Sequence, residues 1–420
     1  AAPGKPVDWA SFFPDERLRA LIKLALEHNR DLRIATARVA EAQALYGIQR
    51  ADRLPTVNVG ASLARSRTPA DLSSTGAAVI GQRADVNVGL SSFELDFWGR
   101  VASLSEAAKA SYLATEQAER AFRLTLVSSV ADAYLSLNEA QERLVLAQSA
   151  LETRAQTREL VDRRRQAGLA GDLDYLQADA AFEGARAEVS ALLRQQSAAR
   201  NYLRALVGAE PKDLPAGKTL AEQGITLEQQ ADVPSQVLVR RPDVLAAEQR
   251  LLAANANIGA ARAAFFPRIA LTASAGTASR EIDGLFKSGS DAWSFTPSIS
   301  LPIFDYGRNS ANLDLVTVRK NIAVADYERT VQQAFREVAD LLVARDQLAE
   351  QLKAVEAQER SQQRAADIAQ ARYRQGVGSF LEGLDAQRQL VTVQQSLIQV
   401  RRAMWSAAAQ LYKALGGEEG

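Results

Sequence analysis

The chain has 420 residues, in which 50 basic side chains balance 50 acidic ones, so nothing in the total charge points to a nucleic-acid partner. Cysteine is absent, and histidine and methionine each occur once, which excludes disulfides, thiolate chemistry and cysteine-based metal sites. The one histidine, His28, lies in a helical pattern and is interpreted as a helix-surface residue. Because the chain also contains no catalytic motif, we expect no enzyme activity, no cofactor and no metal site.

The first half of the chain begins with helices and then changes to strands. After an irregular start that contains proline, the apolar spacing predicts helices over 15–29 and 31–53. The period then changes to two, which predicts strands at about 54–65 and 84–96, joined by a loop over 66–83. We therefore expect a β-hairpin with a long Ser-, Thr- and Gly-rich connection.

A very long helix is predicted after this hairpin. Proline, the strongest helix breaker, is absent from 70 to 210. A helix from 99 to about 164 would extend for on the order of 100 Å at about 1.5 Å per residue. Such a helix does not fit a compact globule of this size, so it must run alongside other helices. A turn around Gly168 then reverses the chain into a second helix over 172–207.

The second half of the chain repeats the first. At an offset of about 212, Asp31, Arg38, Ala42, Gly47, Arg50 and Pro55 correspond to Asp243, Arg250, Ala254, Gly259, Arg262 and Pro267. The copy predicts strands at about 267–279 and 292–304, followed by a second long helical hairpin. We therefore divide the chain into a first repeat over 1–208, a Pro- and Gly-rich segment over 209–234, and a second repeat over 235–420.

A glycine-bearing turn interrupts each long helical pattern. At an offset of about 208, Gly168 corresponds to Gly376, and an apolar residue follows each of them, Leu169 and Val377. We interpret the two turns as the tips of two helical hairpins. A small apolar knob beside a glycine is suited to an end-on contact with another helical hairpin.

The four predicted strands have the length and the alternating pattern of transmembrane β-strands. Aromatic residues stand at their ends, among them Trp98 and Trp293, as in the aromatic girdles of membrane barrels. On the strands alone, a soluble four-stranded sheet with one wet face is an equal alternative. Four strands cannot close a membrane barrel, and open sheet edges cannot lie in lipid. A membrane-spanning sheet would therefore need strands from several chains.

Several motifs carry a family resemblance. They are Arg240-Arg241-Pro242-Asp243-Val244, Ala260-Ala261-Arg262-Ala263-Ala264-Phe265-Phe266-Pro267, Asp305-Tyr306-Gly307-Arg308, Arg372-Tyr373 and Leu384-Asp385-Ala386-Gln387-Arg388. With these motifs, and with both repeats in order over nearly the whole chain, the sequence resembles the TolC family of outer-membrane efflux channels. It is similar in particular to the OprM-like branch, which serves tripartite multidrug pumps.

The resemblance implies an α+β membrane protein of two tandem repeats that assembles as a homotrimer. Each chain would give four strands to one twelve-stranded β-barrel in the lipid of the bacterial outer membrane, continued by a long α-helical barrel in the periplasm. A periplasmic adaptor protein and an inner-membrane RND transporter would dock beneath. The tips with Gly168, Leu169, Gly376 and Val377 would contact the adaptor.

The implied function is a passive exit duct for drugs and other small molecules. Type I protein secretion or metal-ion efflux by the same fold is an alternative, and a soluble coiled-coil scaffold is a less favoured one. The substrate range and the cognate transporter are not encoded in this chain. Many OprM-like members begin with a lipidated cysteine, whereas this chain has none, so either an anchor was removed or this member lacks one.

The resemblance places the expected periplasmic gate at Leu381, Glu382, Asp385, Arg388, Asp174 and Tyr373. A plainer interpretation is that a helix N-terminus favours acidic side chains through its dipole, which alone would account for Asp172 and Asp174. A relative with known gating behaviour has an arginine where this chain has Gly378. Arg372, Arg374 or Arg388 is therefore expected to supply the charge that tethers the gate.

Overall fold

The computed structural model describes residues 8–211, 213–225 and 238–417. The chain forms two compact units. Unit 1 comprises 1–37, 117–245 and 329–420, and unit 2 comprises 38–116 and 246–328. Each unit therefore takes segments from both halves of the chain. Residues 226–234 of the expected segment between the repeats lie outside the described residues.

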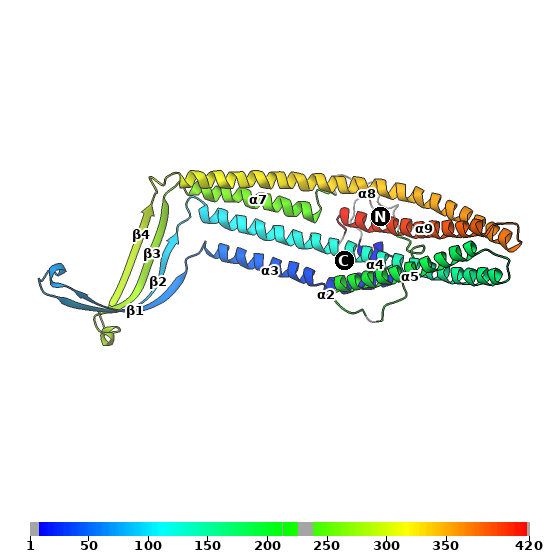
Figure 1. Ribbon diagram of the computed structural model, residues 1–420. Coiled ribbons are helices and arrows are strands. Elements are labelled where there is room, and N and C mark those ends of the chain that lie inside the picture. Colours follow the sequence, from blue (N-terminus) through cyan, green and yellow to red (C-terminus); the bar gives the residue numbers. More distant parts are fainter. Residues whose placement is uncertain (1–7, 212, 226–237, 418–420) are drawn as a thin grey trace. The chain divides into compact units, whose positions relative to one another are not determined.

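Unit 2 contains a four-stranded antiparallel sheet with the strand order β1-β2-β3-β4 (Figure 1). Its strands are β1 (Val57–Thr68), β2 (Val79–Glu94), β3 (Arg268–Ser279) and β4 (Asp291–Ser300). The central pairing of β2 with β3 joins the two halves of the chain and sets Ala84 opposite Ser279. A bulge between Leu90 and Phe93 shifts the register, and Ser92 has a φ of 51° there. One sheet is thus assembled from a hairpin of each half.

The strand bounds differ from the sequence expectation at both hairpins. β2 begins at Val79 rather than at about 84, and β1 extends to Thr68, because 79–82 pairs with 65–68. The loop is therefore shorter than predicted, since its Ser- and Gly-rich composition conceals the outer end of the hairpin. β4 ends at Ser300 rather than at about 304, because Pro302 has no N–H to donate to a strand partner.

The longer helices follow the same order in both halves of the chain (Figure 1). After the short α1 (Trp9–Phe12) they are α2 (Glu16–His28), α3 (Arg30–Ala51), α4 (Arg100–Gln166), α5 (Asp172–Val207), α7 (Pro242–Ala263), α8 (Arg308–Arg374) and α9 (Phe380–Ala414). α4 and α8 have the same length, 67 residues. Within the described ranges, no helix is long and apolar enough to cross a membrane.

Both 67-residue helices begin at a capped junction with a strand-bearing segment. The Asp96 carboxylate accepts hydrogen bonds from the first N–H groups of α4, at 2.7 and 3.1 Å. Asp305 accepts one from the N–H of Asn309 at 2.9 Å. Gly99 and Gly307 have φ values of 73° and 82°, a conformation that glycine adopts without strain. An aspartate therefore caps each junction, and a glycine turns the chain there.

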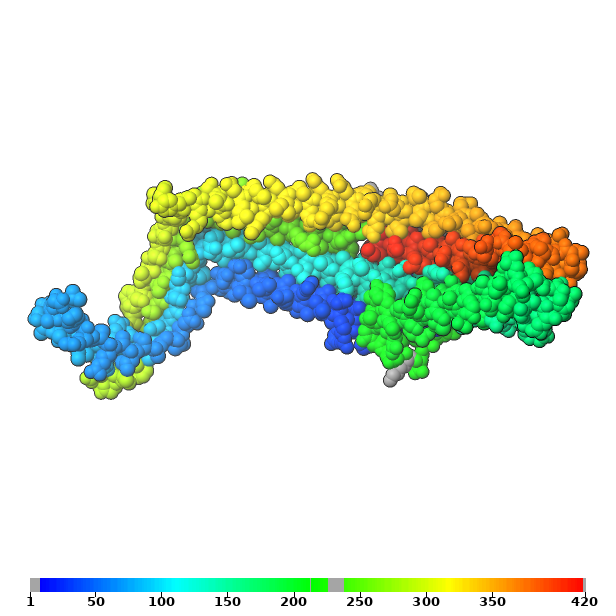
Figure 2. All heavy atoms as spheres, in the orientation of Figure 1, coloured from blue at the N-terminus to red at the C-terminus, as the bar shows by residue number. Residues whose placement is uncertain are grey.

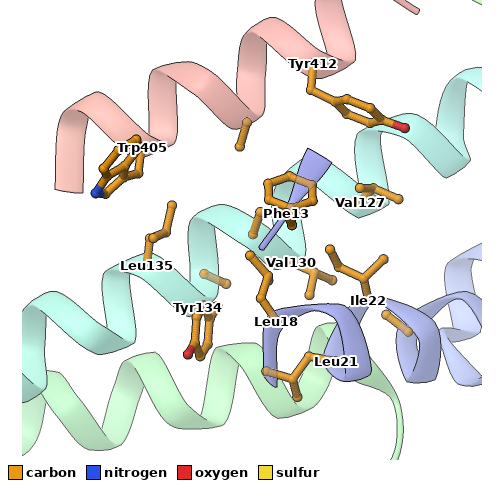
Figure 3. Packing of buried hydrophobic residues seen from close by; sticks show 14 of the residues in the cluster. Phe13, Leu18, Leu21, Ile22, Val127, Val130, Tyr134, Leu135, Trp405 and Tyr412 are labelled. Carbon is orange, nitrogen blue, oxygen red and sulfur yellow. The ribbon is translucent and has the colours of Figure 1, made fainter. Parts of the chain in front are cut away.

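The main core of unit 1 gathers residues from α2, α4 and α9 (Figure 3). Phe13 and Leu18 are fully buried beside Val130 of α4. α9 contributes Trp405, whose Nε1–H donates a 2.7 Å hydrogen bond to the carbonyl of Leu220. This core anchors the α4–α5 and α8–α9 hairpins of unit 1, whose far ends form the tips.

Candidate functional site

The two hairpin tips of unit 1 have the same backbone conformation. At each tip the glycine N–H donates to the carbonyl three residues earlier, and the next N–H donates to the carbonyl five residues earlier, at 2.8–3.0 Å. Gly168 and Gly376 have φ values of 71° and 75°. This is the Schellman ending of a helix, in which a left-handed glycine satisfies the last carbonyls. The equivalence of the two turns in the sequence is therefore an equivalence in backbone geometry.

The residues that follow the glycines project into solvent. Leu169 and Val377 are 70% and 67% exposed. In many Schellman endings the residue after the glycine packs against an apolar side chain in the last helical turn. Here that position in the last turn is occupied by Arg164 at the first tip and by Arg372 at the second. Leu173, in the first turn of α5, is 68% exposed and adds to the apolar surface. Such concentrated apolar exposure is typical of a protein interaction surface.

A small buried cluster lies beneath the turns. Val161 of α4, Ala178 of α5 and Phe380 of α9 are each at most 7% exposed. Tyr373 packs against the cluster, with its ring centroid 5.7 Å from that of Phe380. The cluster therefore joins the α4–α5 hairpin to the α8–α9 hairpin just below their tips.

Two arginines of α4 brace this cluster. The Cζ atom of Arg164 lies 5.2 Å from the centroid of the Tyr373 ring, a cation–π contact between the hairpins. Arg165 makes ion pairs with Asp162 at 2.8 Å and with Asp172 at 3.3 Å. The hydrogen bonds that Arg165 donates to Asp162 and then to Asp172 raise the pKa of its guanidinium. Arg165 thus links the end of α4 to the start of α5.

Four of the expected gate residues lie in the first three turns of α9. The Glu382 carboxylate pairs with Arg372 of α8 at 3.3 Å, and Asp385 pairs with Arg388 at 2.7 Å. Leu381 directly precedes Glu382, lies four residues before Asp385 and is 57% exposed. An exposed apolar side chain is therefore followed by two carboxylates, each paired with an arginine.

The other two expected gate residues are placed differently. Tyr373 is half-buried in the cluster beneath the tips. Asp174 lies in the first turn of α5, and among the described residues it shares no hydrogen bond or ion pair with the gate side chains of α9. Its neighbour Asp172 pairs with Arg165 instead. The structure therefore brings Glu382 and Arg372 together, whereas Asp174 makes no polar contact with the described gate side chains of α9.

Lack of space around the backbone explains why position 378 is a glycine. Its N–H donates to the carbonyl of Arg372 at 3.1 Å. A Cβ atom added there would lie 2.9 Å from the Cβ of Arg372 and 3.2 Å from the N of Tyr373, so any side chain would force the turn to shift. The arginines that pair with the carboxylates of the expected gate are Arg372 and Arg388. Arg374, the third candidate, makes no ion pair within the described part of the chain.

Sequence reasoning assigned no role at the tips to Arg164, Arg165 or Phe380. Arg165 and Asp162 are three residues apart in a helix, a spacing that could have predicted their ion pair. The contact of Arg164 with Tyr373 joins helices from different halves of the chain. No local pattern predicts such a contact, because it depends on which helix faces meet.

Comparisons with known proteins agree on one family. The family model described as "Outer membrane efflux protein" matches residues 21–209 and 233–417. Outer membrane protein OprJ of Pseudomonas aeruginosa is 46% identical over 412 residues, which cover 98% of this chain and 86% of the relative. Solvent efflux pump outer membrane protein SrpC of Pseudomonas putida is 45% identical over 407 residues, which cover 97% and 86%.

A solved structure shows the same fold. The open state of the Neisseria gonorrhoeae MtrE outer membrane channel has a TM-score of 0.87 and 40% sequence identity to this chain. The match covers 98% of this chain and 91% of that one. The likeness therefore includes the sheet as well as the helical hairpins.

Proposed function

The chain belongs to the outer membrane efflux protein family, and we propose that it forms the outer-membrane exit duct of a tripartite efflux system. The observation that carries this proposal is a four-stranded sheet that has one apolar face, one polar face and two open edges. Such a sheet can enter lipid only as part of a larger closed barrel with a polar interior. A barrel of this kind is a channel, and it performs no chemistry on what passes through it.

The open edges favour a homotrimer. Within the described residues, β1 and β4 each lack a strand partner on one side. Lipid offers no hydrogen bonds to such an edge, and membrane barrels have about eight strands or more. Three copies, with β1 of one chain beside β4 of the next, would close a twelve-stranded barrel and leave no edge.

The helices would continue this duct into the periplasm. The equal lengths of α4 and α8 support two tandem repeats, over 1–208 and 235–420, each supplying one long hairpin to an α-helical barrel. Leu169 and Val377, exposed at the tips, would meet the hairpins of a periplasmic adaptor protein. An inner-membrane RND transporter would stand beneath that adaptor.

The start of α9 would form the gate of the duct. In a trimer, Leu381 and Asp385 would each be present three times around one axis. An apolar ring impedes ions because they must shed water to pass, while a carboxylate ring attracts cations. The ion pairs of Asp385 with Arg388 and of Glu382 with Arg372 would hold the first turns of α9 in the closed arrangement. Tyr373, in the cluster beneath the tips, and Asp174, in the first turn of α5, would belong to the same gate.

The cargo is proposed to be organic small molecules, including drugs. One relative is named for solvent efflux, which favours such cargo over proteins or metal ions. Selection among substrates would belong to the transporter, because this chain would act only as the passive exit.

Two measurements test the proposal. Native mass measurement in mild detergent should give three chains per particle, and a monodisperse monomer with intact secondary structure would contradict the barrel. A strain that lacks the gene should accumulate an organic dye, and the intact gene should restore its export. If the deletion strain and the complemented strain export the dye equally well, the proposed role in efflux is contradicted.

A further inference from the structure

The sheet of unit 2 has two chemically different faces. Because residues directly opposite each other in an antiparallel pair share a face, the register assigns every side chain to one of them. On one face, Val57, Val59 and Leu63 of β1 lie opposite Leu90, Val88 and Ala84 of β2. We call this the apolar face. The other face carries Ser62 opposite Asp85, which are joined by a 3.0 Å hydrogen bond.

Two arginines interrupt the apolar face of β1 at the end farthest from the helices. Arg65 and Arg67 follow Leu63 at the same alternation, so both side chains belong to the apolar face. They lie opposite Gln82 and Ile80 of β2. Figure 2 shows the outer end of this hairpin, in blue, standing clear of other segments on the side displayed. A β-strand that is apolar along most of one face thus ends in two positive charges.

Neither guanidinium has a partner in the described part of the chain. Both residues are exposed, and among the described residues neither makes an ion pair or a side-chain hydrogen bond. Arg83, on the opposite face of the same hairpin, behaves differently: its Nε donates to Asp85 at 2.6 Å. Two unpaired arginines and one paired arginine therefore occupy the two faces of one hairpin.

The distance along β1 places the free arginines at one boundary of a bilayer. At about 3.3 Å per residue, Val57 and Arg67 are separated by roughly 33 Å along the strand. With a strand tilt of about 40°, this corresponds to about 25 Å of height, the thickness of the apolar band of a membrane barrel. Arg65 falls slightly inside this boundary, within reach of it through its flexible stem.

We propose that Arg65 and Arg67 form a binding site for the phosphate groups of a lipid in the outer leaflet of the membrane. The guanidinium fork matches phosphate oxygens bidentately, and the apolar residues that precede it would contact the acyl chains of the same lipid. Each barrel would carry three such sites, one on every copy of β1. This inference rests on the proposed barrel, because the barrel decides that the apolar face meets lipid.

The edge position of β1 adds a second component to the site. In the closed trimer, β4 of the adjacent chain would lie beside β1, and its Trp293 belongs to the apolar face through its pairing with Ala275. Trp293 is 78% exposed. An indole at the lipid–water boundary packs on the upper acyl chains while its N–H stays near the headgroups. Asp291 of β4 is on the same face and is the one carboxylate of the strand that could compete for the arginines.

The experiment measures binding of a doubly phosphorylated glycolipid, lipid A, to the purified protein in non-ionic detergent by native mass spectrometry. Each basic residue near a membrane surface contributes about fivefold to binding of anionic lipid, so Arg65→Gln or Arg67→Gln should weaken binding about fivefold and the double variant about 25-fold. Binding should also weaken with added salt, less steeply in the double variant. Dephosphorylated lipid A should bind all variants equally weakly.

Arg83→Gln is the matched control, since it removes one positive charge from the same hairpin on the other face. It should leave lipid A binding unchanged. Equal binding by the double variant and the unaltered protein, or an equal loss in Arg83→Gln, would overturn the inference. Comparable binding of inorganic phosphate alone would overturn the assignment to a lipid.

The same spectra separate this inference from the barrel itself. A single chain per particle in the unaltered protein contradicts the proposed function. A trimer whose lipid binding does not depend on Arg65 and Arg67 contradicts only the lipid site. If the trimer of the double variant dissociates, the arginines would instead pair with Asp291 of the adjacent chain. That outcome would also overturn the lipid site.

Discussion

The hydroxyl of Tyr134 donates a 2.8 Å hydrogen bond to Oδ2 of Asp15, in the core of unit 1. Asp15 also caps α2, accepting from the N–H of Leu18, and it accepts from the N–H of Lys218 at 3.0 Å and from the side chain of Gln223 at 3.0 Å. One fully buried carboxylate therefore joins α2, α4 and the segment that follows α5.

We expect Asp15→Asn to destabilise the protein near neutral pH. Burial alone would raise the pKa of Asp15, but hydrogen bonds from Lys218, Tyr134, Gln223 and Leu18 outweigh it, and the pKa is lowered from 3.8. A carboxyl whose pKa is lower in the folded state stabilises the fold above its unfolded pKa, and this stability is lost as the pH falls through the folded value.

Asparagine offers one acceptor oxygen in place of two, so the loss should be about 1–3 kcal/mol of unfolding free energy. Urea unfolding at pH 7 and at pH 3 measures it, and the difference between Asp15→Asn and the unaltered protein should shrink at the lower pH. Tyr134→Phe is the control, because it removes one donor and keeps the charge. A deficit in Asp15→Asn that is the same at both pH values would contradict the role of the ionised carboxylate.

Arg241 should be far more important for stability than its neighbour Arg240. Arg241 is 5% exposed and donates to Asp243 at 2.8 Å, to Glu337 at 2.8 Å and to the carbonyl of Ala414 at 2.9 Å. Arg241→Ala would leave Asp243 without its cation and Glu337 with Lys413 alone, at 3.4 Å, and should cost about 3–5 kcal/mol. Thermal unfolding followed by circular dichroism measures the loss.

The adjacent Arg240 is the matched control, since it is exposed and differs from Arg241 in setting rather than in chemistry. Arg240→Ala should stay within about 0.5 kcal/mol of the unaltered protein. Similar effects of the two substitutions would show that the ion pairs of Arg241 contribute little to stability.

Val377→Glu should abolish efflux while the protein still folds and inserts. A buried, unpaired carboxylate at an apolar contact costs several kcal/mol, so adaptor affinity should fall by about 100-fold or more. The substitution avoids Gly376, whose φ of 75° would add backbone strain to any change there. Pull-down of the adaptor and resistance of cells to exported drugs measure the effect.

Gly184→Glu is the control for Val377→Glu, because it adds the same charge on α5 where a side chain meets no neighbouring atom. It should leave resistance unchanged. Full resistance in cells that carry Val377→Glu would place the adaptor contact away from the tips.

The double variant Leu381→Ala, Asp385→Ala should open the gate. It shortens the exposed leucine and removes the carboxylate that pairs with Arg388 at 2.7 Å. Single-channel conductance in planar bilayers should rise, preference for cations should fall, and cells should become sensitive to large antibiotics such as vancomycin.

The control for the gate is Asp367→Ala on α8, which removes an exposed carboxylate that accepts a 3.0 Å hydrogen bond from the side chain of Gln363. It should leave conductance unchanged. If the gate variant gives a normal yield of trimers with unaltered conductance, Asp385 does not form the gate and is only a carboxylate near a helix end.

Local properties of the sequence determined much of the fold. The absence of proline from 70 to 210 allowed the length of α4 to be predicted, and a glycine after each long helix allowed both tips to be placed. Alternation predicted four strands, although it missed the outer end of the first hairpin. These predictions succeed because helix length, turns and strand periodicity depend on residues close together in the chain.

Only the tertiary structure decided which distant residues meet. The sequence identified the tip glycines, but it did not predict that Arg164 would lie over Tyr373 or that a side chain at 378 would collide with Arg372. It identified the alternation of β1, but the pairing with β2 was needed to place Arg65 and Arg67 on the apolar face, where neither forms an ion pair with a described residue. The physical reason is that contacts between distant segments depend on the packing of whole helix faces and on strand register, and no short stretch of the chain specifies either.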